Sequence, residues 1–452
     1  MKQATASFAA RFADLVGAEH VLTGAGDLAA CIVDGLRPTT VVRPGSAAEV
    51  AEILRLAAAE RLSVIAMGGR TKLGIGMPPR SYDLALDLTR MDRVLAFDPA
   101  DLTLGVEPGV RFAQLEQHLA AKRQFLPLAP AFAARATLGG MIAANADSPL
   151  RHAYGSARDQ LLGMEFVTGA GVAAKSGGRV VKNVTGYDLH QLLVGSLGTL
   201  AIITRLNFRT QPLPLEERMF IASFAGQDGA LDFCRAIAKS QLQPRLVEAF
   251  NPATARILAS ARVPVDRWSV AGAAAGHRAV VARHEQDLSR MARDLHAADF
   301  AAFDGPDQSA LFAALCEFPR LILEAYYGAA IFRMAVLPGE MLNLIAETLA
   351  VSKRHQLEPA ILVRAGGILY AALLPLQDDA DGTARLATAC RELMQTSVGV
   401  GARPMIEWCP VAVKREVNVW PLPGNDQPID EKLKRLFDFQ GILAPGRFLG
   451  GL

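Results

Sequence analysis

The stretch GGRVVKNVTGYDLHQLLVGSLGTLAIIT, residues 177–204, carries the pattern that decides the fold. Gly186 follows an extended basic run, and Gly195 and Gly198 separate a predicted short helix from an apolar strand. Glycine is favoured where the backbone needs a positive φ or must approach another group closely. A loop, helix and loop that lead into a buried strand would place bare backbone against a large flat cofactor. The glycines would also serve as simple tight turns, and their spacing leaves both interpretations open.

A second glycine-rich loop, residues 68–74 with the sequence GGRTKLG, follows a predicted strand at 62–67. Successive glycines let backbone N–H groups converge on an anion, and Arg70 and Lys72 would add positive charge. The loop does not match the GxxxxGK[ST] pattern of a P-loop. A surface turn of mixed polarity is the alternative. The preceding helix is predicted to begin with a capping box formed by Ser46 and Glu49.

Two relaxed GxGxxA patterns, at 24–29 and 169–174, do not indicate a dinucleotide-binding fold. The first precedes the region in which strands and helices alternate, and it lacks a free acidic residue about 20 positions further on. The second joins two predicted strands and therefore indicates a β-hairpin, whereas the dinucleotide motif needs a strand-to-helix turn.

Composition limits the function classes. Hydrophobic residues make up 51% and charged residues 20% of the 452 residues, which is typical of a globular chain. The formal net charge of +2 gives no support to a nucleic-acid partner. No run of about 18 apolar residues predicts a membrane span, and residues 1–16 are predicted to form an amphipathic helix. The isolated cysteines argue against an iron–sulfur cluster or a cysteine-only zinc site and favour reduced thiols in the cytoplasm; they are Cys31, Cys234, Cys316, Cys390 and Cys409.

A third glycine-rich stretch, TLGGMIAAN at 137–145, is followed by RHAYGSARD at 151–159. Small residues there would let the start of a helix lie against a flat group. Residues 216–410 alternate predicted strands and helices, which indicates an α+β domain that is ferredoxin-like in parts. Its polar strand residues would face a substrate cleft, lie on a solvated sheet face or form core ion pairs; they are Arg333, Arg364, Tyr370 and Glu407.

The ordered set MGGRTKLG, ATLGGMIAAN with YGSARD, and GGRVVKNVTGYDLHQLLVGSLGTLAIITR resembles the FAD-binding domain of the vanillyl-alcohol oxidase / p-cresol methylhydroxylase superfamily. Within it, the chain resembles the FAD-binding subunit of bacterial glycolate oxidase, and GRVVKNVTGYDL is the most specific run. The tail, with LKRLFD at 433–438 and GILAPGRF at 441–448, looks like the closing segment of that family. The resemblance is strong over residues 36–215 and 411–450 and weak between them.

The resemblance implies an α+β fold with a two-subdomain FAD-binding domain of the p-cresol methylhydroxylase (PCMH) type and an α+β cap domain. The expected division is an N-terminal helical segment at 1–35, the FAD-binding domain at 36–215, the cap domain at 216–410 and a C-terminal segment at 411–452 that returns to the FAD-binding domain.

Carried over position by position, the resemblance also implies the FAD contacts. The first loop would wrap the pyrophosphate, the second stretch would lie by the pyrophosphate and the flavin, and the third would hold the adenosine and ribityl parts. Glycines and helix N-termini suit phosphates, and apolar strand residues suit flavin rings. The predicted cofactor-binding residues are Gly68, Gly69, Arg70, Thr71, Lys72, Leu73, Thr137, Leu138, Gly139, Gly140, Ala144, Ser156, Asp159, Gly186, Gly195, Gly198, Thr199 and Ile202.

Departures from the family pattern refine the expectation. Covalent members attach the flavin through a histidine or cysteine in the first glycine loop, and this loop has neither, so non-covalent FAD is expected. Related D-2-hydroxyacid dehydrogenases carry a metal motif similar to HxGDGN, which does not occur after residue 216, so no metal is expected. Ala444 replaces the asparagine of the family's closing NPG, which would remove one polar contact. No catalytic residue is predicted.

The function implied is that of an FAD-binding subunit in a glycolate oxidase-like complex. The complex would oxidise glycolate or D-lactate to the 2-oxo acid, with a catalytic flavoprotein subunit and an iron–sulfur subunit as partners. The expected location is the cytoplasm, and association with the inner face of the membrane through the complex stays open. The alternatives are a self-sufficient FAD-linked 2-hydroxyacid dehydrogenase and a non-catalytic flavin-binding structural subunit.

Overall fold

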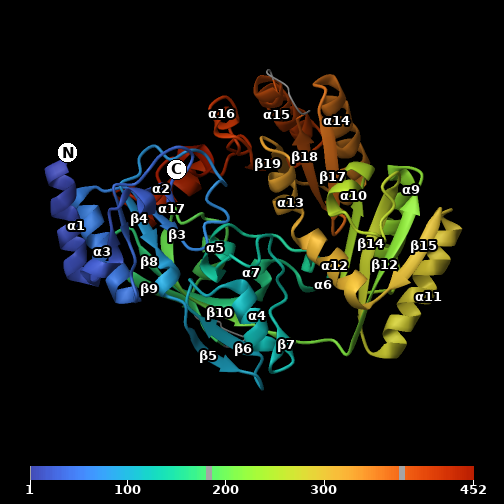
Figure 1. Ribbon diagram of the computed structural model, residues 1–452, viewed down its shortest axis with the longest axis horizontal. Coiled ribbons are helices and arrows are strands. Elements are labelled where there is room, and N and C mark those ends of the chain that lie inside the picture. Colours follow the sequence, from blue (N-terminus) through green and yellow to red (C-terminus); the bar gives the residue numbers. More distant parts are fainter. Residues whose placement is uncertain (1, 180–185, 376–381) are drawn as a thin grey trace. The chain divides into compact units, whose positions relative to one another are not determined.

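The computed structural model describes residues 2–179, 186–375 and 382–452 (Figure 1). Contacts divide the chain into two units. Unit 1 comprises Met1–Ala146, Ser156–Pro212 and Leu422–Leu452, and unit 2 comprises Asp147–Gly155 and Leu213–Pro421. Unit 2 thus takes a short segment, residues 147–155, out of the region predicted to be the FAD-binding domain. The four-part division expected from the sequence stays a prediction.

Unit 1 contains a four-stranded sheet in the order β1-β2-β4-β3, in which β4 is parallel to both β2 and β3. These strands are short and apolar, as strands that are covered on both faces usually are. Ser46 caps α3 as predicted, since its Oγ accepts from Glu49 N at 3.2 Å. Glu49 Oε2 accepts from Gly45 N at 2.8 Å, so its bond goes to the residue before the N-cap and not to the Ser46 N–H of a capping box. The elements are α1 (Lys2–Val16), β1 (Val21–Leu22), α2 (Ala25–Ala29), β2 (Thr40–Val42), α3 (Ala47–Glu60), β3 (Val64–Met67) and β4 (Leu84–Asp87).

The second sheet of unit 1 is antiparallel, with the order β5-β6-β10-β8-β9. The pairing of β8 with β9 is the hairpin predicted around residues 169–174. The strands are β5 (Val94–Asp98), β6 (Thr103–Val106), β8 (Leu161–Thr168), β9 (Ala173–Gly177) and β10 (Ala201–Arg209), with a separate pair β7 (Gln124–Phe125) and β11 (Gln211–Pro212); the helices are α4 (Phe112–Ala120), α5 (Leu138–Ala143), α7 (Ala157–Gln160) and α8 (Leu189–Leu193).

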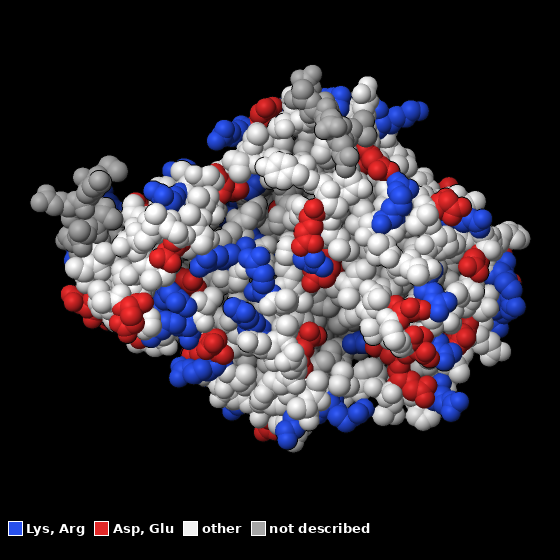
Figure 2. All heavy atoms as spheres, viewed as in Figure 1, with Lys and Arg blue, Asp and Glu red and all other residues white. Residues whose placement is uncertain are grey.

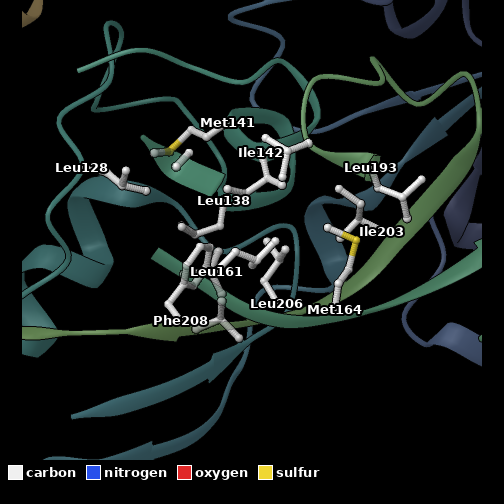
Figure 3. Packing of buried hydrophobic residues seen from close by; sticks show 14 of the residues in the cluster. Leu128, Leu138, Met141, Ile142, Leu161, Met164, Leu193, Ile203, Leu206 and Phe208 are labelled. Carbon is white, nitrogen blue, oxygen red and sulfur yellow. The ribbon is translucent and has the colours of Figure 1, made fainter. Parts of the chain in front are cut away.

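The core on this sheet fixes α5 in place. Leu138 and Ile142 of α5 are fully buried and pack with Leu161 of β8 and Leu206 of β10 (Figure 3). Burying a leucine or isoleucine side chain contributes roughly 1.5–3 kcal/mol. The first turn of α5 is therefore held firmly against the sheet that also leads out of the third glycine-rich stretch.

The C-terminal part of unit 1 closes the edge of the first sheet. Helix α17 (Gln427–Phe437) is followed by residues that pair with β3: Val64 N donates to Ile442 O at 2.8 Å, and Ala444 N donates to Val64 O at 2.8 Å. Leu443 forms a parallel bridge with Val64. In Figure 1 the red α17 accordingly lies among the blue elements of unit 1. The tail thus returns to the FAD-binding domain region, as the resemblance implies.

Unit 2 is built on one eight-stranded sheet, in the order β15-β12-β14-β13-β17-β18-β16-β19, with every neighbouring pair antiparallel. Its strands are β12 (Glu216–Phe224), β13 (Leu246–Phe250), β14 (Trp268–Gly276), β15 (Asp299–Phe303), β16 (Ala330–Ala335), β17 (Glu358–Arg364), β18 (Ile368–Leu374) and β19 (Arg403–Trp408). Its helices are α6 (Arg151–Tyr154), α9 (Gln227–Lys239), α10 (Pro252–Leu258), α11 (Arg278–Asp294), α12 (Gly305–Cys316), α13 (Phe318–Ala325), α14 (Met341–Arg354), α15 (Gly382–Gly399) and α16 (Val411–Lys414).

The sheet consists of two ferredoxin-like halves. Strands β12 to β15 form a βαββαβ motif around α9 and α11, with α10 inserted, and strands β16 to β19 form a second one around α14 and α15. The halves join where β13 pairs with β17. The predicted α+β cap, ferredoxin-like in parts, therefore has a ferredoxin-like arrangement throughout its sheet.

The polar strand residues of this sheet form buried ion pairs. Arg364 pairs with Glu248 across the joint between the two halves, and its Nη1 lies 3.3 Å from Asp147 Oδ2. Tyr370 OH donates to the same Asp147 oxygen at 3.1 Å. Arg333 Nη1 lies 2.9 Å from Glu407 Oε1. Of the three interpretations open from the sequence, ion pairs describe Arg333, Arg364 and Glu407, whereas Tyr370 makes a hydrogen bond.

Candidate cofactor-binding site

The three glycine-rich stretches meet at two adjoining cavities in unit 1. Both are open to solvent, and with the solvent space at their mouths included their volumes are about 430 Å³ and about 520 Å³. Both are lined by the end of β3, by the first turn of α5 and by Leu197. Segments that lie more than 120 residues apart in the chain thus form one site.

The paired glycines of the first loop allow a close approach between two chain segments. A Cβ atom on Gly69 would lie 1.7 Å from the carbonyl oxygen of Arg135, and one on Gly68 would lie 2.2 Å from Thr137 Oγ1. Gly69 N donates to Thr137 Oγ1 at 3.4 Å. A side chain at either position would therefore push the first loop away from the segment that starts α5.

The basic side chains of the first loop are engaged by the protein itself. Arg70, with a φ of 59°, directs Nη2 to Asp87 Oδ2 at 2.9 Å. Lys72 Nζ donates to Ala131 O at 3.2 Å and lies 5.6 Å from the centre of the Phe132 ring. Thr71 and both basic residues line the larger cavity together with Leu73. Arg70 and Lys72 thus place positive charge at the larger cavity, and their hydrogen bonds to Asp87 and Ala131 anchor the first loop.

The second stretch presents the start of α5 to both cavities. Gly139 packs against Pro108, where an added Cβ would lie 2.6 Å from Pro108 Cβ. Gly140 and Thr137 line both cavities, Gly139 lines the smaller one and Ala144 lines the larger one. Leu138 points into the core and lines neither, so its contribution is to fix the helix.

The third stretch is tied to α5 by its backbone. Gly195 N donates to Ile142 O at 3.0 Å, and Leu197 N donates to Ala143 O at 2.8 Å. Gly195 and Gly198 both have positive φ, of 86° and 70°, as the turn interpretation requires. Gly198 lines the smaller cavity with Ile202 of β10, whereas Gly195 shapes the turn behind it.

Several predicted residues do not line these cavities. Thr199 is buried and donates its hydroxyl to Ser196 O at 2.7 Å. Gly186 has a φ of 78°, and nothing lies within 4 Å of its would-be Cβ. Ser156 and Asp159 form the capping box of α7, with Asp159 Oδ2 2.7 Å from Ser156 N. The predicted basic run at 180–185 lies outside the described residues.

The sequence analysis missed several lining residues, among them Leu88, Pro108, Leu197 and Ile203, and one charged residue, Arg447. Its side chain lines the larger cavity, is 3% exposed and donates through Nη2 to Leu73 O and Ile75 O, both at 2.6 Å. Burial lowers the pKa of the Arg447 guanidinium, and Asp34 and Tyr82 act in the opposite direction. Its position in the GILAPGRF tail that resembles the family's closing segment was the available signal.

The residues present fit FAD. The smaller cavity has an apolar wall that includes Leu88, Pro108, Ile202 and Ile203, which suits a flat ring system. The larger has glycine amides and basic side chains, which suit a diphosphate. The would-be Cβ of Gly140 meets only Thr137 Oγ1, at 3.3 Å, so the backbone leaves room there for a bound group.

A family described as "FAD binding domain" matches residues 38–176. The chain carries an FAD-binding domain. Among curated relatives, it is 26% identical to "Glycolate oxidase subunit GlcD" of Bacillus subtilis, covering 91% of this chain and 88% of that protein. It is 32% identical to "Glycolate oxidase subunit GlcE" of Escherichia coli over 43% of this chain and 54% of that protein. It is 31% identical to the mitochondrial "D-lactate dehydrogenase [cytochrome]" of Arabidopsis thaliana, covering 49% of this chain and only 39% of that protein.

Solved structures show the same fold. A p-cresol methylhydroxylase with substrate bound superimposes with a TM-score of 0.81 at 17% identity, covering 98% of this chain and 97% of that one. A 4-ethylphenol oxidase from Gulosibacter chungangensis gives 0.78 at 18% identity, covering 98% and 96%. The chain is an FAD-linked oxidoreductase, and its fold is that of p-cresol methylhydroxylase. The predicted fold class and the predicted FAD are confirmed.

The structure also bears on membrane spans, metal sites and surface charge. Over the residues that the structure describes, no helix is long and apolar enough to cross a membrane, and no group of three or more His, Cys, Asp or Glu side chains is placed to hold a metal ion. On the face drawn in Figure 2, basic and acidic side chains are interspersed, in keeping with the net charge of +2.

Proposed function

We propose that this chain is the FAD-binding subunit of a glycolate oxidase-like complex, in which glycolate or D-lactate is oxidised to the corresponding 2-oxo acid. The observation that carries the proposal is the match to a glycolate oxidase subunit along 91% of this chain. Relatives named as D-lactate and D-2-hydroxyglutarate dehydrogenases support the same substrate class, a 2-hydroxy acid.

Within unit 1, the proposed cofactor contacts come from the three glycine-rich stretches. The backbone amide of Gly68 and the basic side chains of the first loop would face the diphosphate, beside Gly140 of α5. The N–H groups of Leu138 and Gly139 donate to Val110 O at 2.9 Å and to Pro108 O at 2.8 Å, so they fix the start of the helix. The apolar wall formed by Ile202 and its neighbours would cover the flavin rings and exclude water from them. When bound, FAD supplies a ring system that accepts a hydride. The role of this chain's residues is to bind and orient it, and no catalytic base is assigned.

The FAD is proposed to be bound non-covalently. The first loop has no histidine or cysteine, and none occurs among the residues that line either cavity. A covalent bond to the flavin in other members needs such a side chain. Acid precipitation should therefore release the yellow colour into the supernatant, and colour that stays with the pellet would contradict the proposal.

The proposed partners are a catalytic flavoprotein subunit and an iron–sulfur subunit. No disulfide joins the five cysteines, all of which lie among the described residues, and the chain has no CxxC motif, so an iron–sulfur cluster would have to lie on another subunit. Reduced thiols are typical of cytoplasmic proteins, and we propose that location, with contact to the membrane only through the complex.

A second candidate is a self-sufficient FAD-linked 2-hydroxyacid dehydrogenase. The relative named "D-lactate dehydrogenase" of Archaeoglobus fulgidus favours it, at 32% identity over 60% of this chain. In this case unit 2 would hold the whole substrate site.

One experiment separates the candidates. The chain is purified alone, reconstituted with FAD and mixed anaerobically with glycolate, D-lactate or, as a control, L-lactate, and flavin bleaching is followed. Bleaching only after the partner subunits are added supports the complex. Bleaching by the chain alone supports the second candidate. Failure to bind FAD at all would overturn both.

A further inference from the structure

Lys434 occupies a core position on α17, although its neighbour two residues earlier, Lys432, is exposed. Lys434 is 8% exposed, and its ammonium group donates to Thr199 O at 2.7 Å and Leu443 O at 2.9 Å and pairs with Asp438 Oδ2 at 2.7 Å. These partners account for all three of its protons. A buried ammonium costs several kcal/mol of desolvation unless it is paired and hydrogen-bonded in this way.

Two partners of Lys434 lie next to segments that line the cofactor site. Thr199 directly follows Gly198, which lines the smaller cavity, and Leu443 is bridged to Val64 of β3, the strand that runs into Gly68. One side chain therefore connects the third glycine-rich stretch with the strand that carries the first. An apolar residue at position 434 would fill the space but would leave these two carbonyl groups without a donor.

Asp438 completes this arrangement. It is 1% exposed, and its carboxylate accepts from Ile442 N at 3.1 Å and from Leu443 N at 2.8 Å. It thereby fixes the residues that pair with β3 and balances the charge of Lys434. Burial lowers the pKa of the Lys434 amine, while Asp438 raises it, so the pair is held as an ion pair by mutual contact.

Arg447 acts on the other end of the first loop. Its guanidinium holds the carbonyl groups of Leu73 and Ile75 and lies at the wall of the larger cavity. We term Lys434, Asp438 and Arg447 the C-terminal clamp. Arg447 contacts the end of the first loop region, and Lys434 contacts the third stretch. Lys434 and Asp438 act on β3 indirectly, through residues 442–443, which pair with Val64. All come from residues 422–452, although the loops they hold lie at 64–75 and 195–199.

We propose that Lys434 and Arg447 are positioning residues that hold the first and third glycine-rich stretches at the separation FAD requires. Cofactor affinity then depends on the C-terminal segment, most of which lies outside the cavities. The inference rests on the proposed placement of FAD in these cavities.

The test uses full-length Lys434→Met and Arg447→Met, with Lys432→Met as the matched exposed control. FAD dissociation constants are measured by the change in flavin fluorescence, and melting temperatures are recorded with and without FAD. We expect each clamp variant to raise the dissociation constant at least tenfold, about 1.4 kcal/mol, and to reduce the FAD-induced rise in melting temperature. The control should match the wild type in both measurements.

Further variants keep the test decisive if a single substitution prevents folding. Lys434→Met combined with Asp438→Asn removes both buried charges together, and Arg447→Lys keeps one donor and should give an intermediate affinity. Clamp variants that bind FAD like the wild type, even with a lowered apoprotein melting temperature, would overturn the inference. Failure of the wild-type chain to bind FAD would instead overturn the proposed function.

Discussion

Replacing Gly140 with alanine should change the stability of the apoprotein and its affinity for FAD in opposite directions. Gly140 lies inside α5, and alanine is favoured over glycine in a helix interior by about 1 kcal/mol. Within 4 Å of the new Cβ, the only heavy atom would be Thr137 Oγ1, at 3.3 Å. This slightly short contact with a hydroxyl group, which also accepts from Gly69 N, removes a few tenths of that gain. The net expectation is roughly 0.5 kcal/mol of added stability.

The same methyl group would stand at both cavities, since Gly140 lines each of them. Overpacking of a fitted site costs about 1–3 kcal/mol, which corresponds to an FAD dissociation constant about 5- to 150-fold higher. Thermal melts of the apoprotein and fluorescence titration with FAD measure the two effects separately. The apoprotein should melt about 1–2 °C higher.

Gly26→Ala is the matched control. Gly26 is also a helical glycine of unit 1, its would-be Cβ meets nothing within 4 Å, and it lines neither cavity. It should gain stability without loss of affinity. If Gly140→Ala folds and binds FAD as tightly as the wild type, the cofactor does not lie against α5, and the proposed placement of FAD in the two cavities is wrong.

Three other outcomes are expected. Gly69→Ala should lower the free energy of unfolding by about 1–3 kcal/mol or more, because the new Cβ would overlap the Arg135 carbonyl oxygen. An unchanged midpoint of urea unfolding would refute this. Arg364→Met should cost about 3–5 kcal/mol, because the Glu248 carboxylate stays buried without its cation, and part of the loss should return when Glu248→Gln is added. Burial lowers the pKa of His190 below 6.5, so its contribution to stability is present above that pH and is lost as the pH falls through the folded-state pKa. Melts between pH 5 and 8 should show a smaller loss toward low pH for His190→Asn than for the wild type, and parallel profiles would exclude this role.

Local chemistry made much of the site predictable. Gly68 and Gly69 directly follow a strand, and glycine pairs there indicate close backbone approach, which the structure shows against Arg135 and Thr137. The S-x-x-D pattern of Ser156 and Asp159 is a capping-box signature, so their role in α7 was also legible from spacing. The resemblance placed them at the cofactor, and their exposed cap geometry does not bring them to the cavities.

Contacts between distant segments were not predictable from one sequence. Arg70 is engaged by Asp87, and the sequence does not say which of many carboxylates it would meet. Lys434 contacts a carbonyl group 235 positions earlier, and Arg447 one 374 positions earlier. A buried lysine also breaks the expectation that lysines on a helix face water. Such positions become visible only when the whole fold is assembled.

The order in which the segments of unit 1 are synthesised constrains its assembly in the cell. Residues 213–421 emerge from the ribosome before residues 422–452. At a translation rate of about 5–20 residues per second, some 10–50 s pass between the synthesis of Pro212 and that of the tail. During that interval β3 lacks its neighbour at 442–444, and the carbonyl of Thr199 lacks the ammonium that later binds it. The nascent chain therefore displays an open strand edge, and stable loading of the cofactor is expected only after translation of the tail.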